Sequence, residues 1–130
     1  MALAAQRQSD RANLTLDGRW IAQLAGKYDG VTDLTQTAAN GSHTFHHTDI
    51  LAEHESLRTT FEANGASVYL LQATDFGRQR PSGRTIWVTV ADAGLYSADD
   101  TSRWCSRMFP NLTKKQVTNV CLPRQLQQPY

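Results

Sequence analysis

The amino-acid sequence predicts an α+β fold, in which helices pack on one face of a small antiparallel sheet. Apolar residues alternate with a period of two in three separate segments, and they recur with a helical period between the first and second of these. Helix-capping residues follow the third segment. The predicted order is βαββα with a possible final β, similar to a ferredoxin-like arrangement. The length of 130 residues suits one domain.

The domain is expected over residues 19–126, and its first strand over 19–26. Trp20, Ala22 and Leu24 alternate there with other apolar residues, which is typical of a covered strand. Residues 1–18 lack such a period and are expected to form a flexible tether or a partly helical lead-in, and residues 127–130 a tail. Residues 29–47 form a long loop, a feature that is usually functional or disordered in a small domain.

A helix is predicted from Thr48, its expected N-cap, to the stop signal Asn64-Gly65. Its apolar stripe runs from Ile50 to Phe61. Strands over 66–74 and 85–91 follow, and we expect them to pair antiparallel across a basic loop. On that reading Ile86, Val88 and Val90 face the helices and the residues between them face outward.

The last forty residues are expected to hold two capped helices and an edge strand. Ser97 precedes an acid by three residues, as in a capping box, and Pro110 ends the helix that it starts. Thr113 with Gln116 repeats the device for a short helix ending near residue 119. Residues 120–126 contain a proline, which restricts them to an edge strand or an extended tail.

Cys105 and Cys121 are the only cysteines, and fifteen residues separate them. A CxxC pair is absent and no histidine follows His54, so the local spacing disfavours zinc. We predict a disulfide between the two, with two buried thiols as the alternative. A disulfide implies an oxidising compartment and hence an extracytoplasmic location, in the cell envelope or secreted.

Charge is divided unevenly along the chain. Residues 1–100 hold all 12 acids and 8 basic residues, and residues 101–130 hold 5 basic residues and no acid. The basic stretch is either a polyanion-binding surface or a solvated helical face, and we expect no nucleic-acid partner. No apolar stretch is long enough to span a bilayer, so we expect any membrane tether to lie outside this chain.

Two segments resemble the SPOR domain, a peptidoglycan-binding module named for sporulation-related repeats. Residues 20–26 (WIAQLAG) are similar to the family's opening strand, an aromatic followed by V-Q-L and small residues. Residues 86–98 (IWVTVADAGLYSA) are similar to its third strand and to the Gly/aromatic turn before its second helix. The chain also resembles extracytoplasmic portions of actinobacterial envelope proteins, including receptor-type Ser/Thr kinases.

The resemblance implies a non-catalytic extracytoplasmic binding or sensor domain that recognises a cell-wall glycan or peptide. It also suggests ligand contacts on the face opposite the helices, at Gln23, Trp87 and Thr89, and at Arg84. Arg78 joins this set because the loop over 75–84 carries three arginines, which can clamp a carboxylate or phosphate.

Four histidines within twelve residues support an alternative, a metal-dependent hydrolase. They are accompanied by two acids, but no HExxH motif occurs and one histidine lies on the apolar stripe of the predicted helix. We therefore expect no bound metal, no cofactor and no catalysis. A protein-interaction domain without a small ligand is the third hypothesis. The four histidines are His43, His46, His47 and His54.

Overall fold

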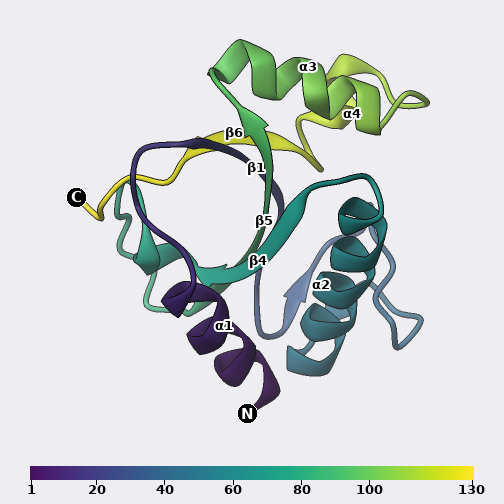
Figure 1. Cartoon of the computed structure of the whole chain (residues 1–130). Helices are drawn as coiled ribbons and strands as arrows, with labels where there is room; N and C mark the ends of the chain where they lie inside the picture. Colours follow the sequence, from purple (N-terminus) through teal and green to yellow (C-terminus); the bar gives the residue numbers. More distant parts are fainter.

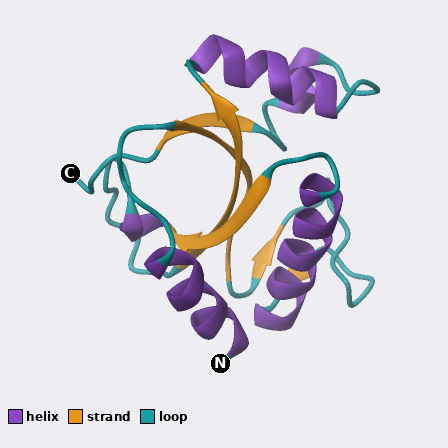
Figure 2. Cartoon of the chain, viewed as in Figure 1, coloured by secondary structure: helices purple, strands orange, loops and turns teal.

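A computed structural model describes residues 1–130, and it confirms the predicted α+β class with a small antiparallel sheet (Figures 1 and 2). The main sheet has the strand order β4-β5-β1-β6, and β2 and β3 form a separate two-stranded sheet. The helices are α1 (Ala2–Ala12), α2 (His47–Glu62), α3 (Ala98–Met108) and α4 (Lys114–Val117), with a short 3₁₀ helix η1 (Ala73–Asp75). The strands are β1 (Trp20–Tyr28), β2 (Val31–Thr32), β3 (Thr44–Phe45), β4 (Ser67–Gln72), β5 (Ile86–Leu95) and β6 (Leu122–Gln125).

All pairings in the main sheet are antiparallel, including the predicted pairing of β4 with β5. The register of β1 against β5 shifts twice, between Trp20 and Ala22 and between Gln23 and Ala25. Such irregularities bend a strand and increase its twist. In Figure 1 the strands and the segment after α1 curve round into a ring, and the helices lie outside it.

Both faces of this curved sheet are buried, so the expectation of a free face opposite the helices is wrong. On the helix side, strand residues pack against α2 and α3 in clusters that include Phe61 and Trp104. The other side is covered by the segment after α1, by the loop after η1 and by the residues after β6, which contribute Leu14, Phe76 and Leu126. Its core consists of Leu14, Ile21, Leu71, Phe76, Val88, Val90 and Leu126.

The first twelve residues belong to the folded domain. They form α1, which packs against β4 and buries Leu3 to 1% exposure. The Asp10 carboxylate accepts a hydrogen bond from the backbone N–H of Leu70 at 2.7 Å, and Arg7 donates to both oxygens of Asp75. We expected a tether or a partly helical lead-in, and the segment is a helix that covers the outer edge of β4.

The start of α2 differs by two residues from the prediction. His46, and not Thr48, is the N-cap, because the Asp49 carboxylate bonds back to the His46 N–H at 2.9 Å. The same carboxylate also accepts from the backbone and side chain of Asn40. At the other end, Gly65 has φ +90°, a left-handed conformation that favours glycine.

The C-terminal third forms as predicted. Ser97 accepts a hydrogen bond from the Asp100 N–H at 3.0 Å, and the predicted cap of α4 also forms. Cys105 of α3 is bonded to Cys121, with Cα atoms 5.7 Å apart, and β6 follows at the edge of the sheet with Pro123 in it. None of the helices is both long and apolar enough for a membrane span.

Candidate functional site

A cleft of about 620 Å³ opens between the loop over residues 73–86, strand β6 and the last residues of the chain. Its lining includes four arginines and contains no aspartate or glutamate. None of the four takes part in any of the molecule's ion pairs. The cleft therefore concentrates positive charge that no ion pair neutralises, and Tyr130, which also lines it, supplies the charge of opposite sign that acts on Arg124. The arginines are Arg78, Arg80, Arg84 and Arg124.

Hydrogen bonds connect the first part of the loop that carries three of these arginines to itself and to the last residues of the chain. The Gln79 side chain donates hydrogen bonds to the carbonyl oxygens of Phe76 and Gly77. The C-terminal residues lie beside the loop, as Figure 1 shows: Gly77 N–H donates to Gln127, and Tyr130 N–H donates back to Gly77. This bonding preorganises the cleft, which lowers the cost of ordering it when a ligand binds.

Arg124 comes from β6 and is the most enclosed of the four. Its Nη1 donates to Oε1 of Gln23 on the neighbouring strand β1 at 2.7 Å, and its guanidinium lies 4.7 Å from the ring centre of Phe76. A side chain at Gly77, where φ is +70°, would place Cβ 3.2 Å from Nη2. The backbone turn and the position of Arg124 therefore both favour glycine there.

The half-buried guanidinium of Arg124 has no carboxylate partner. Its burial lowers the pKa of this group, and the nearby positive charge of Arg80 lowers the pKa further, whereas the charge of Tyr130 partly offsets both effects. A guanidinium nevertheless stays protonated in proteins, so the charge remains. An enclosed and oriented cation that has no ion-pair partner is typical of a site that receives an anion.

The remaining arginines lie at the exposed rim of the cleft. The guanidinium of Arg84 stacks over the Tyr28 ring at 4.3 Å from its centre, which supports its plane while leaving N–H donors free. Arg78 and Arg80 belong to the same loop. Together with Arg124 they present forked donors that match carboxylate and phosphate geometry.

The structure brings two of the predicted contacts, Arg78 and Arg84, to one cleft. Gln23 takes another role, because its side chain holds Arg124. Trp87 and Thr89 were expected to face outward, and this is wrong: they are 4% and 3% exposed. Both lie on the helix side of β5, because the residues that alternate with them fill the opposite core.

Two parts of the cleft were not predicted: Arg124 was not singled out as a ligand contact, and the residues after 126 were expected to be only a tail. Arg124 was visible as one of five basic residues in the last thirty. No local signal distinguishes it from the other four, since its position depends on the pairing of β6 with β1, about a hundred residues away in sequence.

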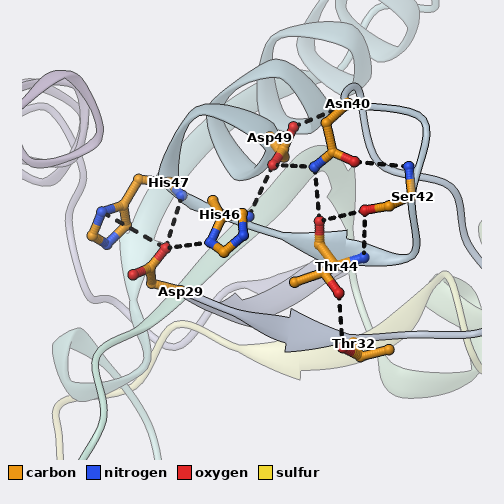
Figure 3. A network of polar contacts seen from close by, with 8 residues as sticks. All are labelled: Asp29, Thr32, Asn40, Ser42, Thr44, His46, His47 and Asp49. Atoms are coloured by element: carbon orange, nitrogen blue, oxygen red, sulfur yellow. Dashed lines mark hydrogen bonds and ion pairs between the residues drawn. The ribbon is translucent and has the colours of Figure 1, made fainter.

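The four histidines do not converge on one site. His46 and His47 lie near Asp29, whose Oδ1 is 3.6 Å and 4.0 Å from their Nδ1 atoms (Figure 3). His43 bonds to a backbone carbonyl in the loop, and His54 is buried against the sheet. No group of three or more His, Cys, Asp or Glu side chains is placed to hold a metal ion.

The polar network around Asp49 instead orders the long loop (Figure 3). The Asn40 amide donates to Asp49 at 2.7 Å and to the carbonyl of Thr44 at 2.9 Å. The backbone N–H of His46 is the main cause that lowers the pKa of Asp49, which keeps the carboxylate ionised. These contacts tie the loop to the start of α2, which is a structural role.

Comparison of the chain with protein-family models, with curated proteins and with solved structures finds no match. The resemblance to the SPOR domain therefore stays a prediction.

Proposed function

We propose that this is a non-catalytic extracytoplasmic binding domain, whose arginine cleft takes an acidic group of a cell-wall glycan or peptide. The observation that carries the proposal is Arg124, a half-buried guanidinium that Gln23 and Phe76 hold and that takes part in no ion pair. The Cys105–Cys121 disulfide supports an oxidising compartment.

The chemistry of the lining favours binding over catalysis. Besides the arginines, the cleft is lined by amide and hydroxyl side chains, among them Gln72, Ser82 and Gln125. These groups and the permanently charged guanidiniums donate hydrogen bonds, and a guanidinium does not act as a general base. The cleft therefore suits a ligand that carries negative charge together with further hydrogen-bonding groups.

Binding to purified peptidoglycan sacculi tests the proposal, with Arg124→Met as the variant. Removal of the buried cation should weaken binding at least about tenfold, as for the loss of an anchoring charged contact. Arg107→Met is the matched control, because Arg107 is exposed on α3 and outside the cleft, so the same net charge is lost there. Circular dichroism verifies that both variants fold.

An equal loss of binding in the two variants would mean attraction to net charge only. Unchanged binding of Arg124→Met, or no binding by the wild-type domain, would contradict the proposed function. Arg78→Gln and Arg84→Gln should each weaken binding less than Arg124→Met, since exposed charges are screened by water and salt.

A further inference from the structure

A second pocket, of about 570 Å³, adjoins the arginine cleft at Trp20, which lines both. It lies between the turn before β1 and the end of β5. Its lining combines two aromatic rings, of Trp20 and Tyr96, with three charged side chains, of Asp17, Arg19 and Asp92. The pocket is shallow and largely open to solvent.

The charged side chains form a fixed frame of hydrogen-bond acceptors. Arg19 donates through Nε and Nη2 to the two oxygens of Asp17, at 2.9 Å and 2.8 Å, and through Nη1 to Asp92 at 2.9 Å. The Arg19 side chain and its backbone N–H lower the pKa of Asp17 to about 2. Both carboxylates are therefore held by one arginine. Oδ1 of Asp17 accepts twice, from Nε and from the backbone N–H of Arg19, and each of the other three oxygens retains a lone pair for a ligand hydroxyl.

The aromatic side chains add apolar surface to this frame. Tyr96 is 90% exposed, and no aromatic or cationic side chain stacks on its ring. Trp20 is half-buried, packs against the core on the helix side and also lines the pocket. Aromatic surface beside fixed carboxylates matches a pyranose ring, which has apolar C–H groups on its faces and hydroxyls around its edge.

We propose that this pocket is a sugar subsite that binds a neutral pyranose ring. Because Trp20 is common to both pockets, one ligand reaches both when an acidic group lies next to a neutral sugar. This inference rests on the proposed function and narrows it: the ligand is an anionic glycan, and not a peptide.

The test uses a neutral β-1,4-linked N-acetylglucosamine oligomer as the probe, with binding followed by amide chemical shifts. Wild-type protein should bind it, with shifts concentrated in residues 17–20 and 92–96. Tyr96→Ala should weaken this binding about tenfold, whereas Tyr96→Phe, which keeps the ring, should retain it. Leu34→Ala is the matched control, because Leu34 is an exposed apolar residue, 77% exposed, outside the pocket.

Three outcomes overturn the subsite: no binding of the oligomer, shifts confined to other residues, or equal losses in Tyr96→Ala and Leu34→Ala. Binding to sacculi then distinguishes a failure of the sugar subsite from a failure of the proposed function. If Arg124→Met loses sacculus binding and Tyr96→Ala does not, the arginine cleft stands and the sugar subsite falls. If Tyr96→Ala loses oligomer binding and Arg124→Met keeps sacculus binding, the sugar subsite stands and the arginine cleft falls.

Discussion

At the scale of single residues, His54 shows how a position on an apolar stripe decides the role of a polar side chain. The sequence placed it beside Ile50 and Phe61, where a packed histidine is the common outcome, and it is 1% exposed. Its Nδ1 lies 3.0 Å from the hydroxyl of Thr89, and its Nε2 has no hydrogen-bond partner. Protonation would place a charge in this enclosed position.

We predict that the titration of His54 makes the domain less stable in weak acid. Burial lowers the pKa of His54 below its usual 6.5, an effect that the carboxylate of Asp10 on α1 partly offsets. Above 6.5 the ring is neutral in both states and its contribution is complete. Below 6.5 the unfolded chain takes up the proton first, so the free energy of unfolding falls as the pH falls from about 7 toward about 5.

Urea unfolding at a series of pH values measures this decrease. In His54→Gln, which cannot titrate, the decrease over this interval should be smaller, whereas His43→Gln, at an exposed histidine, should behave like wild type. Identical pH profiles of His54→Gln and wild type would contradict the assignment.

At the scale of secondary structure elements, the capped helices α3 and α4 were predictable from the sequence. Which side chains of β5 face the helices was not. The caps of these two helices form between residues three apart in sequence, so the sequence alone predicts them. The pairs are Ser97 with Asp100 and Thr113 with Gln116. In β5, by contrast, every residue from Trp87 to Ala91 is buried. Alternation identifies two sets of residues in such a strand but not which set faces the helices, because both faces are covered.

The same limit explains why α1 and the cleft were missed. Leu3 is buried through contacts with residues from distant parts of the chain, including Leu70. Arg124 acquires its role only when β6 pairs with β1. Local sequence carries no record of such contacts, whereas the arginines of one loop, Arg78 and Arg84, were identified because they are close in sequence.

We predict that α1 stabilises the domain, so that Leu3→Ala lowers the free energy of unfolding by about 2 kcal/mol or more. The reason is the cavity left by a truncated leucine that is 1% exposed. Chemical denaturation measures the change, with Gln8→Ala on the exposed side of the same helix as the control, expected to be within about 0.5 kcal/mol of wild type. Equal stability of Leu3→Ala and wild type would mean that α1 does not contribute to the fold.

At the scale of the whole molecule, the two ends of the chain close the ring of the sheet. Leu14 and Leu126 lie in one buried cluster, and Gly18 N–H donates to the carbonyl of Leu126 at 2.8 Å. The same closure brings the residues after β6 to the loop over 73–86 and so forms the arginine cleft. Fold and candidate site thus depend on the same long-range contacts, and β6 is the element common to both.

The disulfide connects α3 to the residue immediately before β6, and we predict that its reduction destabilises the domain and weakens the cleft. The bridge spans a sequence separation of 16, for which loop closure in the unfolded chain corresponds to about 3 kcal/mol. For a domain of this size that loss lowers the melting temperature by roughly 10 °C. Differential scanning calorimetry with and without a reductant measures the shift, and binding to sacculi below the melting temperature should weaken at the same time, because β6 positions Arg124.

Intact-mass analysis after alkylation without reductant should detect no labelled thiol in the native protein. Two labelled thiols would contradict the bridge and, with it, the support for an oxidising compartment.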